Sequence, residues 1–302
     1  MTDRLRKAVI TRNPQGRWIT VVIGALLASG LSLPAEDKPA APIKESEEAK
    51  RSREELRISL EQVAPLRLQH AGTGAEIERI DHPVFRHSAP LWGGHHGTVW
   101  IWGKRGRPVA VLEMFQVLEQ RLWYQQLHAT TDLPIKMTMT NRETWTPKSS
   151  NVKFQPLPGT PPPAETPSAR MRQMKGIVRK ITAHQLWSWR GGDGARHELR
   201  LLTTPVHRYE DHEQQLIDGA LFIIAQGTNP EATLFLEAVT PVDEPKPIWQ
   251  YGIGRTSNAE IVVSYEDKVI HHDPAVNIDE ILANTNSHWR TTSKIKDIEG
   301  QP

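Results

Sequence analysis

Short runs of alternating apolar and polar residues dominate the chain from about residue 98 onward. The runs at 98–102 and 108–115 flank a Gly-bearing loop, which predicts a β-hairpin. Two further runs, at 122–130 and 135–140, continue the predicted sheet, although residues 116–127 also fit a helix. This half of the chain is therefore expected to be mostly antiparallel sheet.

The second half opens with a helix start signal and continues with strand pairs. Thr166 and Pro167 suit the N-cap and the first helical position. The apolar residues that follow have helical spacing: Met171, Met174, Ile177, Val178 and Ile181. Three hairpins are then predicted, pairing 186–189 with 197–202, 220–226 with 232–239, and 248–253 with 259–265. The whole pattern favours the α+β class, with antiparallel sheets of hairpins and one or two packing helices.

The first 35 residues have the layout of a secretory signal peptide. Five basic residues precede an uncharged apolar run at 18–33, and Ala35 is followed by acidic Glu36 and Asp37. This order predicts export by a Sec-type route with cleavage after Ala35, to the periplasm, the envelope or the exterior. The run is shorter than the ~20 apolar residues of a typical membrane-spanning helix. The alternative is an uncleaved signal, which would be the chain's one membrane anchor.

Composition divides the remainder into a tether, two halves and a tail. Residues 36–55 are Pro/Ala-rich and then highly charged, which predicts a disordered or solvated tether before a folded part that begins near residue 56. A proline-rich segment at 148–167 either links two domains or straps across one. The expected divisions are a first mostly-β half at 56–147, a second half with a helix and antiparallel sheet at 168–290, and a tail at 291–302.

Charge changes this picture only at the N-terminus. The chain has 37 Lys and Arg against 35 Asp and Glu, a formal net charge of +2. Without residues 1–35, which hold five basic residues and one acidic residue, 32 basic and 34 acidic residues remain. Net charge therefore gives no argument for an anionic partner, and no nucleic-acid partner is expected. The absence of cysteine excludes a disulfide framework, a thiolate nucleophile and a cysteine zinc site.

Thirteen histidines are the main chemical resource of the chain. Imidazole suits zinc, copper and nickel, and the candidate ligands of a divalent metal are His82, His87, His95, His96, His207 and His212. Their spacing matches no standard ligand pattern such as H-E-x-x-H, and the same residues fit polar loops between strands. We therefore predict no cofactor, with a divalent metal as the alternative.

Two Trp-x-Trp pairs are candidate ligand-stacking surfaces. Trp100 and Trp102 project to one side of their predicted strand, and so do Trp187 and Trp189, because strand side chains alternate. Exposed coplanar indoles stack on sugar rings, whereas tryptophan on a strand commonly packs in the core. Exposure of a pair would favour a polysaccharide ligand, and burial would favour the core.

Motifs of known enzyme classes are absent from the sequence. There is no G-x-S-x-G elbow and no glycine-rich phosphate loop. Glu113, Glu198 and Glu237 lie in predicted strands, but no spacing places two of them together for glycoside hydrolysis. The basic residues between Arg170 and Lys180 are expected on a solvated helix face.

Several stretches resemble a family of secreted bacterial proteins of unknown function. They are Trp92, the segment 97–102, Gly106-Arg107-Pro108, and the segments 156–159, 196–202, 218–222 and 226–228. The resemblance covers about residues 90–240, implies an exported protein, and assigns no site residue.

These features lead to one functional hypothesis and two alternatives. The signal peptide, the tether and the lack of a convergent motif predict a non-catalytic binding or structural module of the cell envelope or periplasm, with an envelope partner or a polysaccharide. The first alternative is an envelope hydrolase or lyase, with or without a metal, that uses His and carboxylate residues such as His95, His96, Glu113, His207 and His212. The second is a polysaccharide-binding module.

Overall fold

The computed structural model describes residues 46–89, 95–117, 120–139, 142–187, 194–242, 246–277, 279–280 and 285–294. The predicted signal peptide, residues 36–45 of the predicted tether, Trp189 and residues 295–302 lie outside these ranges. Within them the chain is mostly antiparallel sheet with two α-helices, in agreement with an α+β or mainly-β class. None of the helices in the described part is long and apolar enough to cross a membrane.

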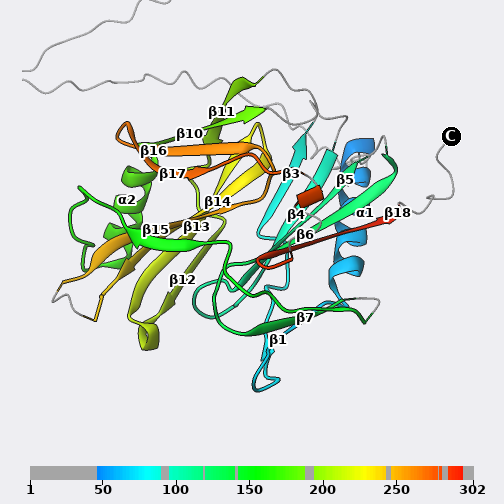
Figure 1. The fold of residues 1–302 in the computed structure, drawn as a ribbon, viewed down its shortest axis with the longest axis horizontal. Coiled ribbons are helices and arrows are strands. Elements are labelled where there is room, and N and C mark those ends of the chain that lie inside the picture. The colour runs from blue at the N-terminus through cyan, green and yellow to red at the C-terminus, as the bar shows by residue number, and fades with distance from the viewer. Residues whose placement is uncertain are drawn as a thin grey trace, which may run out of the picture. The chain divides into compact units, whose positions relative to one another are not determined.

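A five-stranded antiparallel sheet contains the first predicted hairpin (Figure 1). Its strand order is β18 (His288–Lys294), β6 (Leu122–Ala129), β5 (Ala110–Val117), β4 (His95–Trp102) and β3 (Phe85–Ala89). The predicted pairing of 98–102 with 108–115 is confirmed, with Trp100 opposite Leu112. The alternative helix at 116–127 is wrong, because residues 122–129 form β6 and pair with β5 along its length.

Helix α1 (Glu47–Val63) covers one face of this sheet. Ser46 caps it by accepting a hydrogen bond from Ala49 N at 3.1 Å. The buried Ser59 hydroxyl lies 2.7 Å from that of Thr98 and accepts from Trp100 Nε1 at 3.2 Å, which fastens the helix to β4. Helix α1 therefore begins nine residues before the boundary expected for the folded part, and residues 47–55 of the predicted tether belong to it.

A small four-stranded sheet completes the core beneath α1. Its order is β2 (Glu76–Ile77), β1 (Arg67–His70), β7 (Ile135–Thr138) and β8 (Thr144–Trp145). Buried side chains from this sheet, from α1 and from one face of β4 and β5 form a single cluster that includes Trp100, Trp102, Leu112, Met137 and Trp145. Burying such large apolar side chains removes much of the apolar surface of this half from water.

A nine-stranded sheet curls into a half-barrel in the rest of the chain. Its order is β17 (Lys268–Asp273), β16 (Glu260–Tyr265), β10 (Ile181–Trp187), β11 (Ala195–Leu201), β13 (Leu216–Gln226), β14 (Asn229–Val239), β15 (Ile248–Arg255) and β9 (Lys153–Pro156), with β12 (His207–Asp211) also paired to β13. A 3₁₀ turn, η4 (His212–Gln214), links β12 to β13. The predicted hairpin of β13 with β14 is confirmed. Strands β10 and β11 also pair as predicted, but in a different register, because residues 197–199 lie opposite 183–185 and not opposite 186–189, of which 188 and 189 lie outside the described residues.

The third predicted hairpin in this region is wrong. Strand β15 pairs with β14 and β9, whereas β16 pairs with β10 and β17. Arg255 donates to the carbonyl oxygens of Ser257 and Ala259, which shapes the connection, and each strand then continues to a different part of the curled sheet. A short polar loop alone therefore does not indicate a hairpin when both flanking strands have better partners elsewhere.

Helix α2 (Pro167–Val178) packs against the nine-stranded sheet. It begins as predicted, with Thr166 Oγ1 accepting from Ala169 N at 3.3 Å and Pro167 in the first turn. Met174, Ile177 and Val178 are buried against the sheet. Arg170, expected on a solvated face, is also buried, because its guanidinium bonds the Asp218 carboxylate at 2.8 Å.

The proline-rich segment 148–167 runs along the half-barrel and α2. Its β9 portion pairs with the free edge of β15, where Pro156 costs no further ladder bond. Leu157 is buried in the core, and Gln173 of α2 bonds the backbone of Ala164 and Pro162. The segment therefore straps one sheet.

A third apolar cluster lies between the two large sheets. Val99, Ile101 and Val111 project from the face of β4 and β5 opposite α1, and they contact Leu221 and Phe235 of β13 and β14. Strand β18 is the last described strand, yet it pairs with β6 in the first sheet along its whole length. Residues 291–294, expected in a tail, are part of this strand, so the structure does not divide at the boundaries expected from composition.

Candidate functional site

The structure does not bring together in one place the five proposed metal-ligand histidines whose side chains it describes. His82 is exposed and His207 is half-buried nearby, and burial followed by the charge of His82 lowers the pKa of His207. His212 is exposed beside Glu210, and the side chain of His95 lies outside the described residues. Among the residues with described positions, no group of three or more His, Asp or Glu could hold a metal ion.

The remaining two candidate ligands each lie beside a different carboxylate. His96 Nδ1 lies 3.5 Å from Glu55 Oε2, and burial raises the pKa of Glu55. His87 Nε2 lies 3.3 Å from Glu113 Oε1, with side chains 0% and 3% exposed. Neither ring nitrogen of His87 has a hydrogen-bond partner among the described residues, and His87, His96 and Glu55 together line a second cavity of about 650 Å³.

The first predicted stacking pair is part of the core. Trp100 and Trp102 are 0% and 1% exposed and pack under α1, so they present no platform for a sugar. Trp187 is half-buried, and its predicted partner Trp189 lies outside the described residues. Burial of the first pair follows from alternation, because the face that holds both indoles is the face that α1 covers.

The three candidate carboxylates occupy separate places. Glu198 is exposed and pairs with Arg196. Glu237 is fully buried and accepts two hydrogen bonds from Arg107, one from Tyr209 and one from Gln250. A carboxylate with all its acceptor sites used fixes the fold and is not available for acid–base work.

Glu113 has a different neighbour, which the sequence did not indicate. Burial raises the pKa of Glu231 on β14 to about 7, the side chains of Asn229 and Ser257 oppose the rise, and the Glu113 carboxyl adds to it. The half-buried Gln126 contacts this acid pair, with its amide nitrogen 3.4 Å from both Glu113 Oε2 and the carbonyl oxygen of Thr256.

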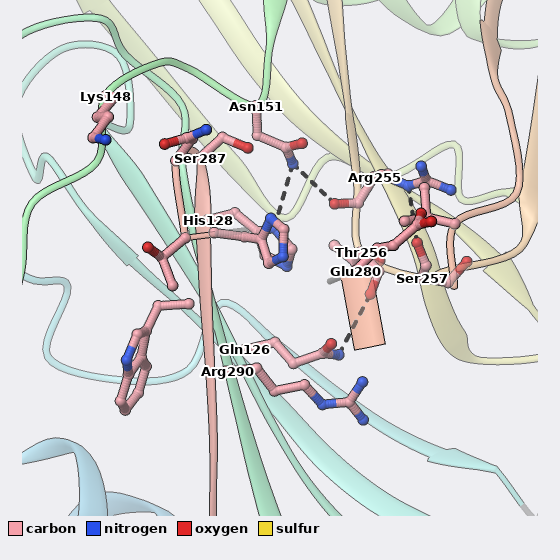
Figure 2. Close-up of a pocket in the computed structure, with 15 residues that line it drawn as sticks. Gln126, His128, Lys148, Asn151, Arg255, Thr256, Ser257, Glu280, Ser287 and Arg290 are labelled. Carbon is pink, nitrogen blue, oxygen red and sulfur yellow. Dashed lines mark hydrogen bonds between the residues drawn. The ribbon is translucent and has the colours of Figure 1, made fainter. Parts of the chain in front are cut away.

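A cavity of about 790 Å³ opens beside Gln126, where both large sheets contribute residues (Figure 2). Gln126 and His128 project from β6, and Arg290 projects from the neighbouring β18. The segment before β9 contributes Lys148 and Asn151, and the loop after β15 contributes Thr256 and Ser257. The wall of the cavity is therefore formed by elements far apart in sequence.

Hydrogen bonds hold the wall of this cavity in place. Asn151 Nδ2 donates to the carbonyl oxygen of Arg255 at 2.9 Å and lies 3.4 Å from His128 Nδ1 (Figure 2). Arg255 Nε donates to the Ser257 carbonyl at 3.0 Å, and burial lowers the pKa of Arg255. The guanidinium of Arg290 lies 4.6 Å from the centre of the Tyr124 ring.

His128 is the central titratable group of the cavity. Burial, with additions from His288, Arg255 and Arg290, lowers the pKa of His128 to about 3. The imidazole is therefore neutral at any pH above this value. Its Nε2 has no hydrogen-bond partner among the described residues.

Sequence reasoning does not single out these residues. Tyr124, Gln126 and His128 alternate along β6 and share one face, which is the available signal. The strand that faces them extends into the expected tail, so the sequence gives no reason to place His288 and Arg290 opposite them. Comparisons with protein-family models, curated protein sequences and solved structures give no match to this chain.

Proposed function

We propose that the protein is an exported, non-catalytic binding module of the α+β class, and that the cavity beside His128 binds its ligand. The observation that carries the proposal is a cavity of about 790 Å³ whose wall holds a neutral imidazole with an unused nitrogen. Binding sites combine such a volume with a few fixed polar groups.

The wall has the chemistry of recognition. Gln126, Asn151, Thr256 and Ser257 offer neutral donors and acceptors; Gln126 lies on β6, and the other three lie in segments that adjoin β9 and β15. Glu113 and Glu231 are buried, and neither is among the described residues that line the cavity, which favours binding over His–carboxylate catalysis.

Export is proposed on the N-terminal sequence. The basic stretch, the apolar run at 18–33 and Ala35 support a Sec-type signal, which would deliver the module to the envelope or beyond. The test is the N-terminal residue of protein recovered from the periplasm or the medium, which should be Glu36. Recovery of the uncleaved chain in the cytosol would contradict export.

A thermal-shift screen of the full chain tests ligand binding. A ligand that binds only the folded state raises the melting temperature as its concentration increases. We expect at least one small polar compound to do so, and His128→Phe to abolish the effect. A stabilising compound that acts equally on His128→Phe would place binding elsewhere, and a panel without any stabilising compound would contradict the proposed function.

A further inference from the structure

The hydrogen bonds of Asn151 determine which nitrogen of His128 carries the proton. The carbonyl of Arg255 can only accept, so the atom of Asn151 that lies 2.9 Å from it must be the NH₂ group. The same NH₂ group faces His128 Nδ1 at 3.4 Å, and Nδ1 must therefore be the acceptor. A neutral imidazole carries one proton, which consequently lies on Nε2.

That Nε2–H group is a donor without an acceptor. No hydrogen-bond partner lies near it among the described residues, and water has almost no access to it. A buried donor left unsatisfied costs about 1–3 kcal/mol, and a native protein commonly retains one where a ligand or ion completes it.

The charged residues around His128 favour a negatively charged group as the acceptor for Nε2–H. Lys148, Arg255 and Arg290 line the cavity, and Glu280 is the one carboxylate among its described lining residues. Asp273 lies near Arg255 on the side of β17. His288, the cross-strand partner of His128, places a second imidazole 6.2 Å away, centre to centre.

Contacts within the protein position two of these cations, Arg255 and Arg290. Arg255 is held by two carbonyl oxygens, and Arg290 lies against the Tyr124 ring. Figure 2 shows Lys148 and Arg255 on opposite sides of His128, with Arg290 below it. The part of the positive potential that comes from Arg255 and Arg290 is preorganised, so an anion binds without ordering these two side chains further.

From these observations we propose that the cavity binds its ligand through an oxyanion, carboxylate or phosphate, that accepts a hydrogen bond from His128 Nε2. The inference rests on the proposed binding function and specifies its ligand class. Because Nε2 is nearly closed to water in the free protein, the ligand oxygen reaches it through a small movement of the side chains around it. Lys148 and Arg290 then neutralise the ligand charge from the cavity wall.

Isothermal titration calorimetry of the full chain at pH 7 tests the proposal with three probes: glucuronate, inorganic phosphate and glucose. Glucuronate and glucose share a sugar ring, so the difference between their affinities reports the contribution of the carboxylate. Inorganic phosphate tests the second proposed oxyanion. We expect at least one of the anions to bind roughly tenfold more tightly than glucose, as a hydrogen bond to a charged group allows.

Three variants connect that affinity to the cavity. His128→Phe keeps the ring shape without the donor and should weaken binding of the anion roughly tenfold. Lys148→Gln should weaken it roughly threefold, whereas Lys268→Gln, an exposed change on β17, should leave it unchanged. Near-ultraviolet circular dichroism confirms that each variant is folded.

The outcomes separate this inference from the proposed function. If glucose bound as tightly as the anions and His128→Phe lost this binding, the oxyanion proposal would be wrong but the location of the binding site would be supported. Anion binding that His128→Phe and Lys148→Gln do not weaken would overturn the inference. No binding of any probe, together with no stabilising compound in the thermal-shift panel, would overturn both.

Discussion

At the scale of single residues, two glycines let an aromatic ring from one neighbouring strand pass over the glycine and contact a carboxylate on the other neighbouring strand. A Cβ on Gly97 would lie 2.2 Å from His87 Nε2, and one on Gly219 would lie 2.3 Å from the Tyr209 ring. Through these gaps His87 approaches Glu113, and Tyr209 donates to Glu237 at 2.9 Å. Glycine is therefore required at these positions for close approach, and each buried carboxylate depends on a glycine one strand away.

Gly97→Ala should destabilise the fold by about 1–3 kcal/mol, because the new methyl group overlaps both His87 and the Met114 carbonyl. Gly176→Ala in α2 is the matched control. Outside the helix's own backbone, no atom lies within 4 Å of the place its methyl group would take, and alanine should stabilise the helix by about 0.4–1 kcal/mol. Urea denaturation measures both changes, and equal effects would contradict the close-approach explanation.

Glu231 should make stability depend on pH in a defined direction. Its folded pKa, about 7, lies above the ordinary value of 4.5, so its stabilising contribution is complete below pH 4.5 and is lost as pH rises to 7. Glu231→Gln stays neutral, and its stability relative to the natural protein should increase by about 3 kcal/mol over that range.

Urea denaturation from pH 4.5 to 8 measures this difference. His128 acts in the opposite sense, because its folded pKa of about 3 lies below 6.5 and its contribution is lost as pH falls through this interval. The natural protein should therefore vary less between pH 4.5 and 6.5 than Glu231→Gln does. Glu213→Gln, on an exposed turn, should leave the natural pH curve unchanged, and a pH-independent effect of Glu231→Gln would contradict the prediction.

At the scale of elements, the loop between β4 and β5 joins the two large sheets. Arg107 extends from this loop and donates to both oxygens of Glu237 on β14, at 2.7 and 2.6 Å. Its guanidinium also lies 4.1 Å from the centre of the Phe154 ring on β9. A short loop of the first sheet thus satisfies a charge that is fully buried in the second.

Arg107→Met should cost about 3 kcal/mol, because it leaves the Glu237 charge buried without its main partner. Lys104 lies in the same loop as Arg107 and forms an exposed ion pair with Asp81. Lys104→Met removes that pair and should change the free energy of unfolding by less than about 0.5 kcal/mol. The free energy of unfolding in urea provides the comparison. If both variants lost a similar amount of unfolding free energy, the loss would come from a change in the loop and not from breaking the buried Arg107–Glu237 pair.

The elements that sequence predicts are those whose signals are local. The β4–β5 and β13–β14 hairpins follow from apolar runs around a glycine turn, and α2 follows from Thr166 and Pro167. Pairing between distant segments leaves no such signal, so the partners of β16 and β18 were not predictable. The cavity forms because β18 lies beside β6. Nothing in the sequence indicates this pairing, so nothing in it distinguishes His128 from the other twelve histidines.

At the scale of the whole described unit, the apolar cluster between the sheets makes them one structure. Leu221 and Phe235 pack against Val99, Ile101 and Val111, and β18 returns the chain to the first sheet. The cavity lies where both sheets contribute, so its shape depends on their remaining packed together.

Native-state hydrogen exchange should therefore give similar opening free energies for β5 and β14, the central strands of the two sheets. Phe235→Ala should lower both, by about 3–5 kcal/mol, because the cavity it creates lies between the sheets. Loss of protection in β14 alone would indicate that the sheets unfold separately.

The claim that the cavity recognises an oxyanion is tested most directly by the ¹⁵N spectrum of the His128 imidazole, titrated with glucuronate and with phosphate at pH 7. The free protein should show a neutral ring with its proton on Nε2, as the bonds of Asn151 require. Addition of at least one anion should shift the Nε2–H signal, and glucose should not. A proton on Nδ1, or an Nε2–H signal that neither anion moves, would contradict the account.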